Sequence, residues 1–463
     1  MERSVSPRVR VIQAGIILAP IAYGTVHPLP VALFQSAAFV LFATWLLDLR
    51  HRTGTWDHVR EPLLLIGFTA VALGIVQLIP LPAPLVAWLS PGTARWAHTG
   101  LESVGIVPWS WRPLAVVPWA TQQGTLWLAA LVCWFAVIQA EVRDPGTARR
   151  VVRTMAFTAI AIGSLGLLQH FSGATAIFWR GTEHASFHGT LVNPNNAAGL
   201  LTLGTMATLA MTLTTRPERR ALWILGALVT AGSAALSLSR GGIGILFFSL
   251  AILAWLTYSG RFSTGPRTWP TRLAPFGFGV ALLAFVAWVG YTDVVGELRT
   301  VQGDTELNGR VPVWMDAVTG MSPDFPLFGI GYGNFEAVYP AYQSQAARVR
   351  YTAVENEYLH ALVEGGLLGA GLALAAVYIL LGRVRRLLTG RRRLGLSIPM
   401  AAGLLGIMAH MLLDFPLHVG GPALWIVATA ALVMGRSAEG QDPLPRPQRL
   451  FPPAESSPAT SGP

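Results

Sequence analysis

Apolar runs of about 20 residues, the length an α-helix needs to cross a lipid bilayer, recur along the whole chain. Short stretches rich in Arg, Gly and Pro separate them. This pattern predicts an all-α, polytopic membrane protein with about twelve transmembrane helices. The expected spanning segments are 11–27, 29–48, 62–80, 121–140, 151–171, 194–213, 221–238, 242–258, 273–292, 358–382, 395–413 and 418–435.

Three connections, 81–120, 172–193 and 293–357, are long enough to hold structure of their own. We expect one transmembrane domain over 1–435, with a large, partly helical loop at 293–357. The tail at 436–463 is rich in Pro and Ser, which predicts disorder. The first apolar run resembles a secretory signal, but no small-residue cleavage site follows it, so we expect a retained helix.

The basic residues are unevenly distributed between the two expected sides of the membrane. All 33 are arginine. If the N-terminus is cytoplasmic, the opposite side carries only eight, which are Arg95, Arg112, Arg180, Arg240, Arg299, Arg310, Arg348 and Arg350. Cytoplasmic loops collect basic residues. Both termini are therefore expected in the cytoplasm, with the loop 293–357 and the shorter tail on opposite sides.

Composition narrows the chemistry. With 52% hydrophobic and 12% charged residues, the chain does not resemble a set of soluble domains. Its arginines lie in brief clusters between apolar runs, which argues for topology rather than nucleic-acid binding. The absence of lysine excludes a lysine nucleophile, and Cys133 is the single cysteine. The spacing of His170, His184 and His188 is not diagnostic of a metal site.

Two arginines on the outer side are candidate anion ligands. Arg240 precedes Gly241 and Gly242, so an anion could approach it closely; the alternative is an arginine that extends to the membrane interface. Arg310 lies four residues before Trp314 in the large loop, and the alternative there is a solvated surface group. A planar guanidinium matches the oxygens of a diphosphate.

Titratable side chains gather where the large loop returns to the membrane. Glu357, His360 and Glu364 share one helical face by their spacing of three and four, and Glu355 precedes them. A carboxylate or imidazole held there could act as a general base. The alternative is a polar helix start, where glutamate favours the positive end of the helix dipole.

Polar residues also mark two other helix ends on the outer side. Asn193 and Asn195 flank a proline where the segment 194–213 begins, and an outward-facing helix N-terminus binds anions; helix capping is the alternative. His410 and Asp414 lie four residues apart near the end of 395–413. We expect these two to hydrogen-bond each other or a neighbouring helix, because an unpaired Asp is costly in a bilayer.

Together these motifs resemble the O-antigen ligase and polymerase family of bacterial membrane glycosyltransferases. They occur in the expected order between residues 185 and 420. Each is weak alone, and their combination with a large outer loop is more specific. The matching elements are Asn193-Pro194-Asn195, Ser239-Arg240-Gly241-Gly242, Arg310 with Trp314, Pro326-Leu327-Phe328-Gly329-Ile330-Gly331, Asn356-Glu357-Tyr358-Leu359, Glu364-Gly365, and His410 with Asp414-Phe415.

The resemblance implies transfer of a glycan from an undecaprenyl-diphosphate carrier to an acceptor hydroxyl at the outer face of the bacterial inner membrane. The acceptor would be a lipid, a glycan or a protein. No metal, other cofactor or nucleic acid is expected. Arg240 and Arg310 match the family's arginines and would offset the charge that builds on the carrier diphosphate. The further substrate-binding positions implied are Asn193, Asn195, Asn356 and Trp314.

The general base is where the chain departs from the family pattern. A histidine usually precedes the Asn of the loop-to-helix motif, and here that position is Glu355. A carboxylate can take the acceptor proton, so inverting displacement with Glu355 as base is expected, and His360 is the second candidate. A transporter of a small anion or lipid-linked sugar is the alternative function, and an inactive scaffold is a third.

Overall fold

The computed structural model describes residues 6–52, 60–102, 105, 110–179, 187–258, 277, 279–280, 284, 305–345, 350–389 and 395–435. Its membrane-type helices are α1 (Pro7–Ile21), α2 (Pro28–Arg52), α3 (Pro62–Leu78), α6 (Pro118–Glu141), α7 (Pro145–Ser172), α8 (Pro194–Thr214), α9 (Pro217–Ala235), α10 (Arg240–Tyr258), α15 (Glu357–Thr389), α16 (Ser397–His410) and α17 (Gly420–Gly435). Each expected spanning segment other than 273–292 coincides with one of them. That segment lies almost entirely outside the described residues, as does the tail 436–463.

Six of these helices are long and apolar enough to cross a membrane, namely α2, α6, α7, α8, α10 and α15. Three others, α3, α16 and α17, are apolar but shorter. The chain is thus an all-α, multi-pass membrane protein. Among the described residues, one small antiparallel sheet pairs β1 (Leu81–Pro82) with β2 (Trp111–Arg112).

Several helices begin earlier than the apolar runs predict. Helix α7 begins at Pro145, although its apolar run begins near residue 151. Proline suits the first turn because its missing N–H has no helical partner there, and the Asp144 side chain accepts a hydrogen bond from the Thr147 amide at 2.7 Å. Capping therefore extends the helix through a polar first turn.

Polar contacts join helix ends that lie far apart in the sequence. The Arg8 guanidinium pairs with Asp48 at 2.7 Å and Glu141 at 2.8 Å, which joins the beginning of α1 to the ends of α2 and α6. At the other end, the Glu357 amide donates to the Met411 carbonyl at 2.9 Å.

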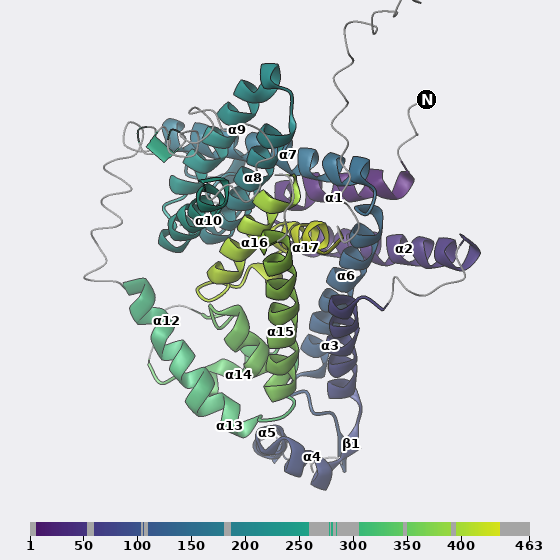
Figure 1. Cartoon of the computed structure of the whole chain (residues 1–463). Helices are drawn as coiled ribbons and strands as arrows, with labels where there is room; N and C mark the ends of the chain where they lie inside the picture. Colours follow the sequence, from purple (N-terminus) through teal and green to yellow (C-terminus); the bar gives the residue numbers. More distant parts are fainter. Residues whose placement is uncertain are drawn as a thin grey trace, which may run out of the picture.

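The loop between α10 and α15 folds into short helices beside α15. They are α12 (Thr305–Met315), a π-helical turn (Asp316–Met321), α13 (Ser322–Asp324) and α14 (Phe335–Val338). In Figure 1, α12 to α14 lie on one side of α15, while α3 and α6 lie on the other. The loop and the start of α15 share a hydrophobic core that is separate from the large core of the other helices. It contains Val313, Phe325, Ile330, Phe335, Tyr339, Val354 and Val363. The expected partly helical loop is therefore present in the described part of 293–357.

Helix α15 is interrupted where residues 326–335, the glycine-rich turn, dock against it. Gly366 has φ 64° and ψ −160°, which no helical residue adopts. The turn supplies backbone partners on both sides of the break: the Ile330 amide donates to the Val363 carbonyl at 2.9 Å, and the Leu367 amide donates to the Pro326 carbonyl at 2.8 Å. The apolar pattern predicted the spanning segment 358–382, which α15 confirms, but it gave no sign of the break at Gly366.

Glycine is required at this contact because backbone meets backbone. A Cβ atom on Gly329 would lie 2.4 Å from the Glu364 carbonyl carbon, and one on Gly366 would lie 2.4 Å from the Leu327 carbonyl group. Both glycines also have positive φ values, a region that side chains disfavour. The glycines at these positions therefore let the turn lock into the break in α15.

Candidate active site

A cavity of about 430 Å³ opens where α8, the α9–α10 turn, α12 and the loop before α15 meet. It brings together groups from four distant parts of the sequence, including two of the three candidate asparagines, one candidate arginine and the candidate carboxylate. Its lining residues are Val192, Asn193, Pro194, Asn195, Leu238, Ser239, Gly309, Arg310, Tyr351 and Glu355.

Arg310 and Glu355 form an ion pair in the lining of this cavity. The Nη2 atom of Arg310 lies 3.5 Å from Oε2 of Glu355, and their side chains are 13% and 21% exposed. Glu355 has φ 57°, a left-handed conformation that costs a non-glycine residue about 1–3 kcal/mol. The surrounding structure must hold Glu355 in place, and that conformation aims its carboxylate at the cavity.

The N-terminus of α8 borders the same cavity. Asn193 caps this 21-residue helix by accepting a hydrogen bond from the Asn195 amide at 2.8 Å. Proline at the first helical position leaves the remaining first-turn amides for other partners. Capping is thus the direct role of Asn193, and the helix dipole adds positive potential beside Arg310.

Arg240 begins α10 directly after the lining residue Ser239 and is not itself among the lining residues of the described chain. Its glycine neighbours allow close packing. A Cβ atom on Gly242 would lie 2.1 Å from the Ala198 side chain of α8, and one on Gly241 would lie 3.5 Å from the His410 ring. Arg240 is therefore held at the junction of α8, α10 and α16.

His410 and Asp414 form a buried pair behind this junction. The Nε2 atom of His410 lies 3.2 Å from Oδ2 of Asp414, with side-chain exposures of 1% and 0%. The same nitrogen lies 3.3 Å from the Asn195 carbonyl oxygen. The pair thus connects α16 to the start of α8.

Trp314 and His360 lie outside the cavity lining and bind the backbone next to Glu355. The Trp314 Nε1–H donates to the Val354 carbonyl at 3.0 Å. The Val354 amide donates to Nδ1 of His360 at 3.4 Å. Both polar backbone groups of the residue before Glu355 are therefore occupied.

Asn356 holds the chain on the other side of Glu355. Its Oδ1 accepts from the amides of Tyr358 at 3.0 Å and Leu359 at 3.1 Å, which caps α15. Its Nδ2 donates to the Leu412 carbonyl at 2.9 Å. In the structure Asn356 is a helix cap, and the cavity does not include it.

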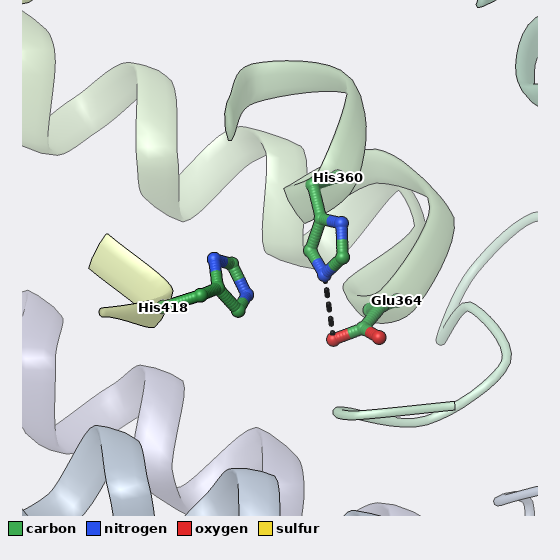
Figure 2. A group of neighbouring side chains, drawn as sticks. All are labelled: His360, Glu364 and His418. Carbon is green, nitrogen blue, oxygen red and sulfur yellow. Dashed lines mark ion pairs between the residues drawn. The ribbon is translucent and has the colours of Figure 1, made fainter. Parts of the chain in front are cut away.

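His360, Glu364 and His418 form a separate cluster, drawn in Figure 2. Their potential ligand atoms lie within 4.8 Å of one another, with His360 Nε2 at 3.2 Å from Glu364 Oε2. A metal-bound imidazole donates its second N–H to an acceptor. The second nitrogen of His360 instead faces the Val354 amide, a donor. The ring proton therefore sits on Nε2, beside the Glu364 carboxylate, and the cluster is a polar network within the protein.

The His418 ring extends this network to the α16–α17 connection. Its Nδ1 lies 3.4 Å from Oε1 of Glu357, and the other oxygen of Glu357 accepts from the Leu417 amide at 3.4 Å. Desolvation lowers the pKa of His418. The nearby Glu357 and Glu364 carboxylates have the larger, opposite effect and raise that pKa to about 9. His418 is therefore cationic at neutral pH, although its side chain is 36% exposed.

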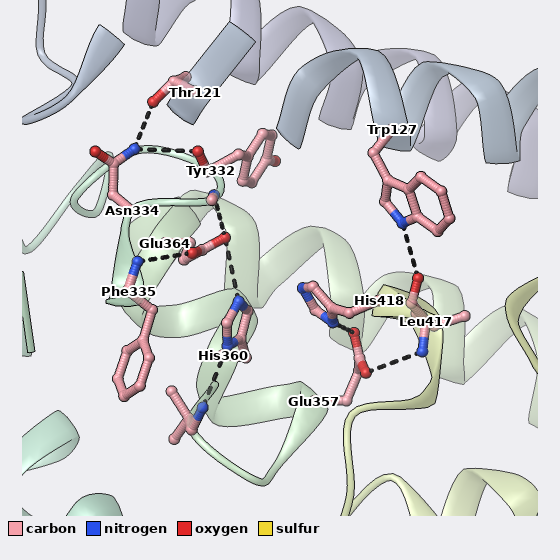
Figure 3. Close-up of polar contacts among 12 residues, drawn as sticks. Thr121, Trp127, Tyr332, Asn334, Phe335, Glu357, His360, Glu364, Leu417 and His418 are labelled. Atoms are coloured by element: carbon pink, nitrogen blue, oxygen red, sulfur yellow. Dashed lines mark hydrogen bonds and ion pairs between the residues drawn. The ribbon is translucent and has the colours of Figure 1, made fainter. Parts of the chain in front are cut away.

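Glu364 and Asn334 fasten the glycine-rich turn, as Figure 3 shows. The Glu364 carboxylate accepts from the Gly333 amide at 2.7 Å and the Phe335 amide at 3.1 Å. The Asn334 side chain accepts from the Val117 amide and donates to Thr121, both at 2.6 Å. These bonds attach the loop that carries Arg310 to α6.

Gln77 in α3 is a third attachment that the sequence analysis missed. Its Nε2 donates to the carbonyls of Phe328 at 2.6 Å and Glu364 at 2.8 Å, and its Oε1 accepts from the Tyr332 amide at 3.2 Å. A lone amide side chain in an apolar run is a signal, since a buried polar group needs partners. The N-terminal helices thus support the site as well as crossing the membrane.

Residues 225–374 match the family model described as O-antigen ligase. This match supports assigning the chain to the O-antigen ligase family. The matched region runs from α9 into α15 and contains Arg240, Arg310 and Glu355, while Asn193 and His410 lie outside it. It supports a membrane glycan ligase or polymerase in general. A comparison with curated proteins gave no match.

Proposed function

We propose that the chain transfers a glycan from an undecaprenyl-diphosphate carrier to an acceptor hydroxyl at the outer face of the inner membrane. The observation that supports this most directly is the cavity in which Arg310, Glu355 and the start of α8 meet. It combines a cation and a helix N-terminus, which suit a diphosphate, with a carboxylate, which suits a hydroxyl proton.

The carrier diphosphate would bind at Arg310 and the start of α8. As the glycosidic bond breaks, negative charge builds on the diphosphate, and a fixed guanidinium stabilises it without reorganising. Arg310 is only 13% exposed, so water screens its charge weakly. Arg240, which follows the lining residue Ser239, would be the second diphosphate ligand.

Glu355 would be the general base. Its ion pair with Arg310 requires the carboxylate in its charged form, which is the form that accepts a proton. The acceptor hydroxyl would give its proton to Glu355 while its oxygen attacks the anomeric carbon. The bond from that carbon to the diphosphate oxygen breaks, the electron pair leaves with the diphosphate, and the configuration is inverted.

The test is a transfer assay with the purified protein in lipid vesicles, a polyprenyl-diphosphate-linked glycan and an acceptor. We expect Glu355→Gln to lower the transfer rate by about 10²–10⁴-fold and Arg310→Gln by about 10²–10³-fold. Matched controls are Glu336→Gln and Arg350→Gln, because these residues form an ion pair in the same loop with side chains 40% and 77% exposed.

The controls should transfer glycan at the wild-type rate, because exposed ion pairs contribute little. If Glu355→Gln and Arg310→Gln also transferred at the wild-type rate, the site assignment would be wrong. If the wild-type protein moved the lipid-linked glycan across the vesicle membrane without forming a product, the transporter alternative would replace the proposal.

A further inference from the structure

His360 is almost fully buried, with 4% of its surface exposed, and neither of its nitrogens faces the cavity. Its Nδ1 lone pair accepts from the Val354 amide at 3.4 Å. Its Nε2, which then carries the ring proton, lies 3.2 Å from Glu364. An imidazole in this state has no lone pair to offer a substrate.

The other partner of His360 is itself fixed. Both oxygens of Glu364 accept backbone hydrogen bonds, from Gly333 at 2.7 Å and Phe335 at 3.1 Å. Its side chain is 5% exposed, so these bonds compete little with water. One end of the His360 ring therefore lies beside Glu364 of α15, whose carboxylate is fixed by the glycine-rich turn.

At its other end the ring contacts the residue before the proposed base. Val354 is fully buried, and the Trp314 indole binds its carbonyl at 3.0 Å. Glu355 follows with φ 57°. A residue in such a strained conformation keeps it only where the surrounding contacts hold it in place. Val354, the residue before it, is held by hydrogen bonds to both its amide and its carbonyl group.

We infer that His360 is a positioning residue, which with Trp314 clamps Val354 and so aims the Glu355 carboxylate at the acceptor hydroxyl. The inference rests on the proposed function, because it assigns His360 to the same reaction. It excludes His360 as the proton acceptor. A displacement of about 1 Å at a reacting group can lower a rate by about 100-fold, so loss of the clamp should be visible in kcat.

Substituting glutamine for His360 distinguishes a general base from a positioning residue. Its side chain has one acceptor and one donor group, so it can accept from Val354 and donate to Glu364, yet it cannot serve as a base at neutral pH. We expect His360→Gln to keep kcat within about threefold of wild type and to keep the wild-type pH profile of kcat/KM. We expect His360→Leu to lower kcat by about 10–100-fold with a smaller change in KM.

Amide hydrogen exchange at Val354 reports the clamp without any substrate. Exchange should be about tenfold faster in His360→Leu, as loss of one hydrogen bond predicts, and unchanged in His360→Gln. Trp314→Phe, which keeps an aromatic ring but removes the other clamp donor, should also lower kcat. It serves as the second test if His360→Leu does not fold. His27→Leu, at an exposed histidine between α1 and α2, is the control.

Two results would overturn the inference. If His360→Gln were as inactive as Glu355→Gln while Val354 stayed protected, His360 would be the base. If Val354 exchanged at the wild-type rate in His360→Leu, the clamp would not exist. Failure of the proposed function looks different, because the wild-type protein would then form no product although the exchange pattern stayed as expected.

Discussion

Replacing Gln77 with leucine would measure how firmly α3 holds the turn that carries the site. Gln77 is fully buried and bonds three backbone groups, the carbonyls of Phe328 and Glu364 and the amide of Tyr332, at 2.6, 2.8 and 3.2 Å. Leucine has a similar size and no polar atom. The substitution therefore removes the hydrogen bonds and keeps most of the apolar contacts.

The expected loss in the free energy of unfolding depends on which hydrogen bonds each partner of Gln77 retains. The Glu364 carbonyl keeps a second hydrogen bond, from the Gly331 amide at 3.1 Å. The Phe328 carbonyl and the Tyr332 amide lose the partner that Gln77 supplies. A buried polar group without a partner costs about 1–3 kcal/mol, so we expect the free energy of unfolding to fall by about 2–4 kcal/mol.

The measurement is equilibrium unfolding in mixed detergent micelles, followed by tryptophan fluorescence. Gln123→Leu is the matched control, because Gln123 lies on the exposed side of the neighbouring helix α6; surface substitutions change stability by about 0.5 kcal/mol or less. If Gln77→Leu unfolded at the same detergent fraction as Gln123→Leu, α3 would not hold the turn through these bonds.

Two further predictions concern the break in α15 and the charge of His418. Gly366→Ala places a Cβ atom 2.4 Å from the Leu327 backbone at positive φ, so we expect no monodisperse protein in size-exclusion chromatography, whereas Gly371→Ala, with no atom within 4 Å, should elute like wild type. The neighbouring Glu357 carboxylate helps raise the pKa of His418 from 6.5 to about 9, so its stabilisation is complete below pH 6.5 and is lost as pH rises through 9. Thermal unfolding between these pH values should show a slope that His418→Gln removes, and an unchanged slope would contradict this origin.

The positions of the helices could be predicted from the chain alone. A segment such as 194–213 must bury an apolar surface in lipid or protein and satisfy its backbone internally, so hydrophobicity and length suffice to locate a helix. Boundaries were less accurate where capping extends a helix, as at Asp144. The break at Gly366 was missed because the partner of the freed backbone is a turn more than thirty residues earlier.

The residues of the candidate site could be recognised from the sequence, but the roles of several of them could not. Arg310 and Glu355 were recognisable because their residue types and neighbours form local motifs, and the structure places them 3.5 Å apart. Trp314, His360 and Asn356 were recognisable as well, but the structure uses them to hold the chain around Glu355 rather than to line the cavity.

Sequence by itself determined which segments are helical and which residue types are present for chemistry, because these depend on local hydrophobicity and on short spacings. The direction of each polar group was decided only by tertiary structure. Gln77 is a single amide in an apolar run, and nothing in α3 indicates that it binds the turn at Phe328. A hydrogen bond depends on where two groups meet in space, and for groups this far apart in the chain that meeting is set by the packing of all the helices between them.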